Sequence, residues 1–154
     1  MGVTTRVVRF IAAPPEAVYR ALLDPQAVQQ WMVPNGMTSR VHRFDPREGG
    51  EFEISLTYDD PAAAGKTAGA TDTFAGRFAE LRPPECVVQV VAFDTPDPAL
   101  AGDMTIRYSL RRHDGGTEVE GIHENLPPGV RPEDNELGWR ISLGKLAALL
   151  EARH

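Results

Sequence analysis

Several residue types that build disulfides, metal centres and nucleic-acid surfaces are scarce in this sequence. Its 154 residues include a single cysteine, Cys86, so no internal disulfide can form, and no two histidines are spaced as ligands on one helix face. Cys86 opens the apolar run 86–91, where we expect a buried structural thiol. Lysine and arginine number 16 against 22 acidic residues, without a basic cluster. We therefore expect neither a metal site nor a nucleic-acid partner.

Long apolar segments and the common catalytic motifs are missing as well. No window approaches the length of a membrane span, and residues 1–10 do not resemble a signal peptide. There is no Gly-x-Ser-x-Gly elbow and no phosphate-binding glycine loop. We expect a cytoplasmic protein without a bound cofactor. The length fits one domain, residues 1–154.

The first part of the chain has the periodicity of one strand followed by two short helices. Residues 3–13 alternate as a strand, with Val8 and Phe10 on the same face. Residues 14–25 and 25–32 each begin with proline and have the apolar spacing of a helix.

The central part of the chain alternates with period two, which indicates half-buried antiparallel strands. Asp114-Gly115 predicts a tight hairpin turn between the last two strands, and Gly76 suggests a bulge. Residues 59–71 have no pattern and are expected to form a loop. The expected strands cover residues 39–44, 51–58, 72–81, 86–93, 104–110 and 117–123.

The chain ends in a predicted long helix over 132–152. Apolar residues recur in it at spacings of four, three and four residues, so we expect them to form a stripe that faces the sheet. These residues are Trp139, Leu143, Leu146 and Leu150. Gly138 and Gly144 weaken this helix, and we expect them to allow close approach of a strand or a ligand. Strands flanked by helices predict an α+β domain, with a sheet that curls around the final helix.

Four segments, in this order, resemble the bacterial homologues of the C-terminal domain of the heat-shock-protein-90 ATPase activator, in the START-like (SRPBCC) superfamily. These segments are residues 10–34, 44–54, 74–93 and 137–151. The resemblance implies a helix-grip fold, in which a curved antiparallel sheet of six to seven strands holds a long C-terminal helix. It also implies a cavity for a lipophilic molecule between sheet and helix.

The residues themselves leave open whether this interior is hollow or filled. If it is hollow, we expect the partner to be a hydrophobic or amphipathic small molecule. His123 and Tyr108 point inward by alternation, either as core residues or as the polar groups of a cavity. The expected lining residues are Trp31, Phe52, Phe78, Met104, Tyr108, His123, Trp139 and Leu143.

Two alternatives differ in function class. The first is an enzyme of the same fold that uses His123 as a general acid or base. The second is a chaperone-associated or regulatory interaction module, for which we expect an exposed apolar patch around residues 31–33. A homodimer through a strand edge or through the same patch is compatible with either alternative.

Overall fold

The computed structural model describes residues 3–33, 35–59, 71–95 and 97–152. Most of the loop expected at 59–71 lies outside these ranges. The elements are β1 (Val3–Ile11), α1 (Pro15–Leu22), α2 (Pro25–Trp31), β2 (Met37–Phe44), β3 (Glu51–Tyr58), β4 (Thr71–Arg82), β5 (Cys86–Phe93), β6 (Met104–His113), β7 (Gly116–Leu126) and α3 (Pro132–Glu151).

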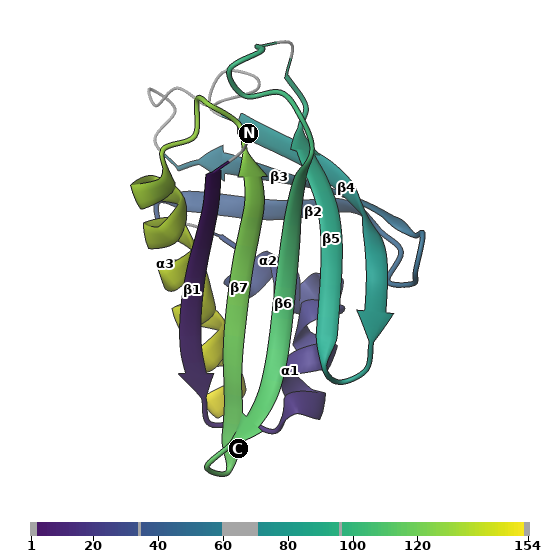
Figure 1. Ribbon diagram of the computed structural model, residues 1–154, viewed down its shortest axis with the longest axis vertical. Coiled ribbons are helices and arrows are strands. Elements are labelled where there is room, and N and C mark those ends of the chain that lie inside the picture. The colour runs from purple at the N-terminus through teal and green to yellow at the C-terminus, as the bar shows by residue number, and fades with distance from the viewer. Residues whose placement is uncertain (1–2, 34, 60–70, 96, 153–154) are drawn as a thin grey trace.

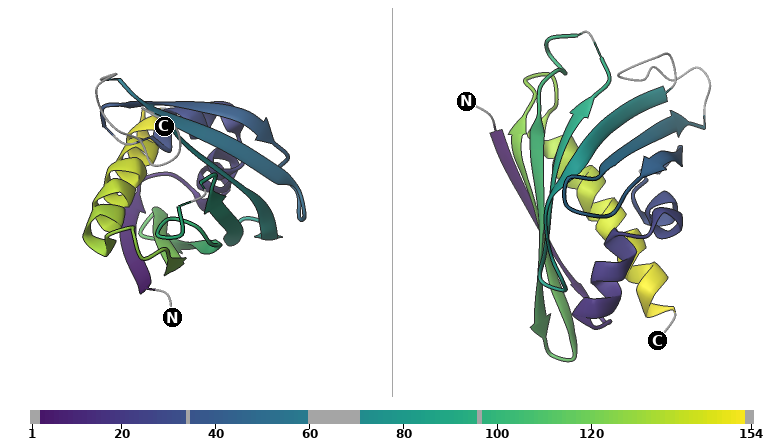
Figure 2. Two further views of the ribbon diagram at one scale, coloured as in Figure 1. Left: turned by 90° about the horizontal axis from the view of Figure 1, so that it is seen from above. Right: turned by 90° about the vertical axis from the view of Figure 1, so that its right-hand side faces the viewer.

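One antiparallel sheet of seven strands curves around α3, in the order β1-β7-β6-β5-β4-β3-β2 (Figure 1). The two strands that come first in the chain lie at opposite edges, because α1 and α2 carry the chain from one edge to the other. The helices lie on the concave face of the sheet, as the side view in Figure 2 shows. This arrangement confirms the predicted α+β helix-grip fold.

Local sequence signals explain where the two short helices begin. Pro15 is the first residue of α1, where a missing backbone N–H costs nothing, and Glu16 complements the helix dipole in the first turn. Asp24 caps α2, and its carboxylate accepts a hydrogen bond from the backbone N–H of Gln26 at 3.0 Å. Both helices are thereby fixed in the connection between β1 and β2.

The hairpin between β6 and β7 has the turn that its sequence predicts. Asp114 and Gly115 both have positive φ, at 47° and 79°, which is the conformation that a two-residue hairpin loop needs. The bulge in β4, by contrast, lies between Phe78 and Glu80 and not at Gly76. A side chain at Gly76 would overlap the carbonyl oxygen of Val90, so this glycine serves close packing between two strands.

The core lies between the concave face of the sheet and the helices. The predicted alternation of β6 is confirmed, with Met104, Ile106 and Tyr108 all buried. In β1 the buried face carries Val7 and Ile11. Val8 and Phe10 lie on the outer face with more than 40% of their surface exposed. On α3, the predicted stripe packs against the sheet through Leu143, Leu146 and Leu150.

Candidate functional site

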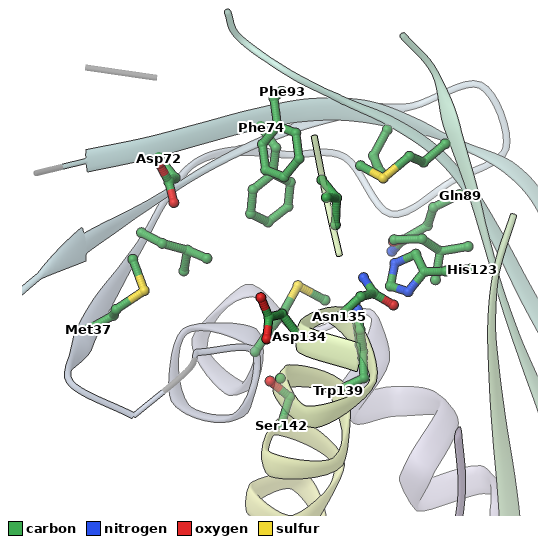
Figure 3. Close-up of a pocket in the computed structure, with 17 residues that line it drawn as sticks. Met37, Asp72, Phe74, Gln89, Phe93, His123, Asp134, Asn135, Trp139 and Ser142 are labelled. Atoms are coloured by element: carbon green, nitrogen blue, oxygen red, sulfur yellow. The ribbon is translucent and has the colours of Figure 1, made fainter. Parts of the chain in front are cut away.

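A cavity of about 180 Å³ lies between the N-terminal half of α3 and the concave face of the sheet (Figure 3). Its walls are mostly apolar, with a small number of polar groups, which is the usual composition of a small-molecule site. The apolar wall includes Leu56, Phe74, Val91, Phe93, Met104 and Ile106. The polar lining residues are Asp72, Gln89, His123, Asp134, Asn135 and Ser142.

Three of the eight residues expected to line a cavity do so, namely Met104, His123 and Trp139. The other five lie outside the lining and are at most 2% exposed: Trp31, Phe52, Phe78, Tyr108 and Leu143. The interior is therefore filled in one part and hollow in another.

Aromatic packing explains the filled part. The rings of Trp31 and Tyr108 meet edge to face with their centroids 6.2 Å apart, and Tyr108 contacts Trp139 at 5.7 Å. Phe52 and Phe78 pack at 5.2 Å on the neighbouring strands. Trp139 contacts Trp31 and Tyr108 and also lines the cavity, together with Asp134 and Asn135 from the first turn of α3.

A row of inward-pointing residues across the sheet places two polar side chains near each other. Gln89 on β5 pairs with Ile106 on β6, and Ile106 pairs with His123 on β7. Gln89 is 3% exposed and His123 is 5% exposed. Figure 3 shows both side chains at the same side of the cavity, opposite Asp72. The register of three neighbouring strands thus creates a buried polar corner.

Asn135 on α3 completes this corner. The hydroxyl of Thr5 donates a hydrogen bond to Asn135 Oδ1 at 2.6 Å. Burial lowers the pKa of His123 to about 4, and the nearby Asn135 side chain offsets only part of this shift. At neutral pH the imidazole is therefore uncharged, with one nitrogen that donates and one that accepts.

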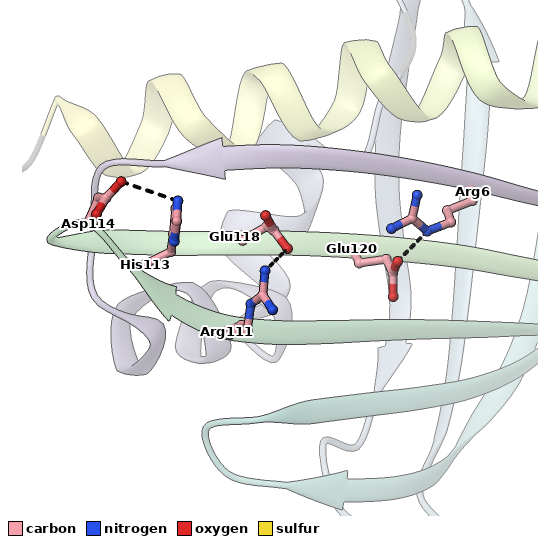
Figure 4. A network of polar contacts seen from close by, with 6 residues as sticks. All are labelled: Arg6, Arg111, His113, Asp114, Glu118 and Glu120. Atoms are coloured by element: carbon pink, nitrogen blue, oxygen red, sulfur yellow. Dashed lines mark hydrogen bonds and ion pairs between the residues drawn. The ribbon is translucent and has the colours of Figure 1, made fainter.

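The outer face of β7 explains why His123 points inward. Glu118 and Glu120 alternate with the buried residues and form ion pairs on the solvent side (Figure 4). The Arg111 guanidinium donates to Glu118 at 2.8 Å, and Arg6 on β1 pairs with Glu120. Exposed pairs of this kind contribute at most about 1 kcal/mol each. Their main effect is on register, because a slip of one residue would bury two carboxylates.

Gln89 and Asn135 were missed at the level of the sequence. Gln89 is the one polar residue in the run 86–91, and an isolated amide inside an apolar strand was a usable signal. Asn135 precedes Trp139 by four residues and so extends the apolar stripe of α3 by one turn. Asp72 gave no signal, because its inward position depends on the strand register that the fold sets.

We expected Gly138 and Gly144 to allow close approach of a strand or a ligand to the backbone of α3. This prediction is wrong for Gly144, and at Gly138 the open space belongs to the cavity. A methyl group at Gly144 would have Arg9 Nη1, the end of a flexible side chain, as its nearest neighbour at 4.0 Å. A methyl group at Gly138 would meet no atom within 4 Å, and Gly138 lines the cavity. The absence of a side chain at Gly138 thus adds to the open volume.

The apolar patch expected at residues 31–33 is not exposed. Trp31 is fully buried, and Met32 and Val33 are each 8% exposed. The segment is held against α3, where the Lys145 ammonium donates a hydrogen bond to the Val33 carbonyl oxygen at 2.6 Å. Residues 31–33 are buried because this hydrogen bond holds the segment against α3 and because Trp31 packs against Trp139.

Two further findings limit the kinds of site. Among the described residues, no group of three or more histidine, cysteine or acidic side chains is arranged to hold a metal ion. In the same part of the chain, no helix is both long enough and apolar enough to cross a membrane.

The arrangement is similar to several solved structures. Protein CV1439 from Chromobacterium violaceum is 36% identical with a TM-score of 0.86, and the match covers 96% of each chain. The AHSA1 protein from Silicibacter pomeroyi is 22% identical with a TM-score of 0.81, over 99% of this chain and all of that one. The AHSA1-like protein from Aeromonas hydrophila, at 20% identity and a TM-score of 0.73, shows the same fold.

No protein of curated function matches this chain significantly. The family whose profile matches, over residues 12–151, is described as activator of Hsp90 ATPase homolog 1-like protein. This match covers nearly the whole fold, from the end of β1 to the end of α3. Together with the similarity to CV1439, it shows that the chain belongs to the activator of Hsp90 ATPase homolog 1-like family of the SRPBCC superfamily.

Proposed function

We propose that this protein binds a small amphipathic molecule in the cavity between α3 and the curved sheet. The family and its fold support a ligand-binding or regulatory module. The observation that carries the proposal is Gln89, which lines the cavity at 3% exposure. Its side-chain amide belongs to the cavity lining, where a polar group of a bound ligand would be within its reach. A hydrogen bond of this kind contributes about 0.5–1.5 kcal/mol.

The size and walls of the cavity favour a compact apolar body. An apolar cavity of about 150 Å³ accepts benzene, so 180 Å³ suits an aromatic ring with a short substituent. Phe74, Phe93 and Met104 would surround this body, and thioether groups adapt readily to different shapes. The polar end of the ligand would lie in the corner formed by Gln89, His123 and Asn135.

Hydrogen bonding, rather than proton transfer, is the role we propose for His123. A general base works best with a pKa close to the working pH. The pKa of His123 is held at about 4 by burial, so its neutral ring would be a poorly matched acid or base at neutral pH. The same neutral ring can donate to, or accept from, an uncharged ligand.

The test is a calorimetric titration with two probes that share a phenylbutyl body. Phenylbutanol carries a hydroxyl group, and butylbenzene lacks it. We expect the wild-type protein to prefer phenylbutanol and Gln89→Met to prefer butylbenzene, a change of about tenfold in the ratio of affinities. Gln30→Met, on the exposed side of α2, is the matched control and should behave as wild type. If neither probe binds the wild-type protein, the proposed function is contradicted.

A further inference from the structure

We infer that the cavity selects ligands whose polar group accepts a hydrogen bond, such as a carbonyl, because the Asn135 amide is held with its N–H donors toward the open space. This inference rests on the proposed function and adds the chemical class of the ligand. Asn135 is half-buried and lines the cavity. The inference also assigns a positioning role to Thr5, which lies outside the lining.

The Asn135 amide is oriented by a residue of the sheet. The Thr5 hydroxyl donates a hydrogen bond to Asn135 Oδ1 at 2.6 Å, and Thr5 is only 4% exposed. Thr5 on β1 pairs with His123 on β7, so these two inward side chains lie next to each other. The backbone of Asn135 is fixed as well, because its N–H donates to the Arg131 carbonyl oxygen at 3.0 Å. The bond to Thr5 therefore determines which end of the amide faces the sheet.

The effect of Asn135 on His123 agrees with this orientation. A neighbour that accepts a hydrogen bond from an imidazole favours the protonated ring and so raises its pKa. Asn135 raises the pKa of His123, against the larger effect of burial. Figure 3 shows the oxygen of the Asn135 amide on the side of His123 and the nitrogen toward the open space. The carbonyl oxygen thus faces the sheet, and the N–H donors of the amide face a ligand.

Gln89 and His123 do not impose the same preference. A glutamine amide has a donor end and an acceptor end, and a neutral imidazole has one nitrogen of each kind. These two residues can therefore pair with either kind of ligand group. Asn135 differs because Thr5 already engages its acceptor. A carbonyl oxygen of the ligand would pair with the Asn135 donors, whereas a ligand that offers only an N–H group would not.

The experiment compares uncharged bicyclic probes of nearly the same size by calorimetric titration at neutral pH. Indanone carries a carbonyl acceptor, indole carries an N–H donor, and indene carries neither. We expect the wild-type protein to bind indanone about three- to tenfold more tightly than indole. Phenylbutanol, titrated in parallel, reports on the proposed function itself.

Two variants separate the donor from the residue that orients it. Asn135→Leu keeps the approximate size of the side chain without its amide, so the preference for indanone should disappear while indene still binds. Thr5→Val removes the hydroxyl and keeps the shape, so the amide can turn and the preference should fall by at least about threefold. Thr4→Val, on the exposed side of β1, is the matched control and should keep the wild-type ratio. Thermal unfolding of each variant confirms that it is folded.

The outcomes separate the inference from the proposed function. If phenylbutanol binds but indanone and indole bind equally, or indole binds more tightly, the selection of acceptors is overturned and ligand binding stands. An unchanged ratio in folded Asn135→Leu would overturn the selection as well, because the Asn135 donors would then have no part in it. An unchanged ratio in folded Thr5→Val would overturn the positioning role of Thr5. Binding of none of the probes, phenylbutanol included, would overturn both the inference and the proposed function.

Discussion

The imidazole of His123 packs against the indole of Trp139, with the ring centroids 4.7 Å apart. One ring comes from β7, next to the edge strand β1, and the other from α3, so this contact joins the sheet and the helix at the cavity wall. Trp139 in turn contacts Tyr108 and Trp31, which belong to the filled part of the core. The boundary between packed core and open cavity therefore runs through the Trp139 side chain.

The burial of His123 predicts a pH-dependent stability. Its pKa is about 4 in the folded state and about 6.5 in an unfolded chain, so the unfolded state binds more protons between these values. The stabilising effect of the neutral ring is complete above about pH 6.5 and is lost as the pH falls toward 4, by at most about 1.4 kcal/mol per pH unit.

Denaturant unfolding of the wild-type protein and His123→Gln across this pH range checks the prediction. The difference in unfolding free energy between the two proteins should change with pH, because the carboxylates titrate alike in both. A constant difference from pH 7 to pH 5 would show that His123 titrates normally.

The two tryptophans should respond differently to truncation. Trp31 is fully buried, and its indole N–H donates to the Ala21 carbonyl oxygen at 3.2 Å, so Trp31→Ala should cost about 3–5 kcal/mol. Trp139 is partly exposed beside the cavity, so Trp139→Ala should cost less stability but weaken phenylbutanol binding. Equal losses of stability in denaturant melts would argue against a cavity beside Trp139.

Tyr108→Phe should leave the stability unchanged or raise it by up to about 1 kcal/mol. The Tyr108 hydroxyl is fully buried and, within the described part of the chain, has no hydrogen-bonded partner. Its burial also raises the pKa of the phenol well above 10. Thermal unfolding of the variant checks this expectation. A loss of more than about 1 kcal/mol would mean that the hydroxyl has a partner, such as a bound water.

Periodicity predicted the fold because it depends on local chemistry. Each of the correctly predicted features depends on residues that are close together in the sequence. They are the alternation of β6 and β7, the Asp114-Gly115 turn and the apolar stripe of α3. The face of β1 was harder to assign, since Val7 and Val8 are identical residues on opposite faces and the pairing with β7 decides which is buried.

The cavity was less predictable than the fold. Whether an inward aromatic residue fills the core or lines a cavity depends on how far apart the sheet and α3 lie at that point. Phe52 and Phe74 both belong to the alternating strands, yet Phe52 packs against Phe78 and Phe74 lines the cavity. No pattern in the sequence measures this separation.

The two glycines of α3 give the most direct test of a ligand-binding cavity. Both lie inside the helix, so replacement of either by leucine should improve its intrinsic stability by up to about 1 kcal/mol. Only Gly138 lines the cavity, and a side chain there would enter open volume. Gly144 lies six residues, or about 1.7 turns, further along the helix and outside the lining.

The decisive measurement is a calorimetric titration of phenylbutanol into the wild-type protein, Gly138→Leu and Gly144→Leu, with thermal unfolding of each to confirm that it is folded. We predict that the wild-type protein and Gly144→Leu bind the probe with similar affinity and that Gly138→Leu has lost binding by at least about tenfold. Undiminished binding by a folded Gly138→Leu protein would contradict the cavity beside α3 as the binding site.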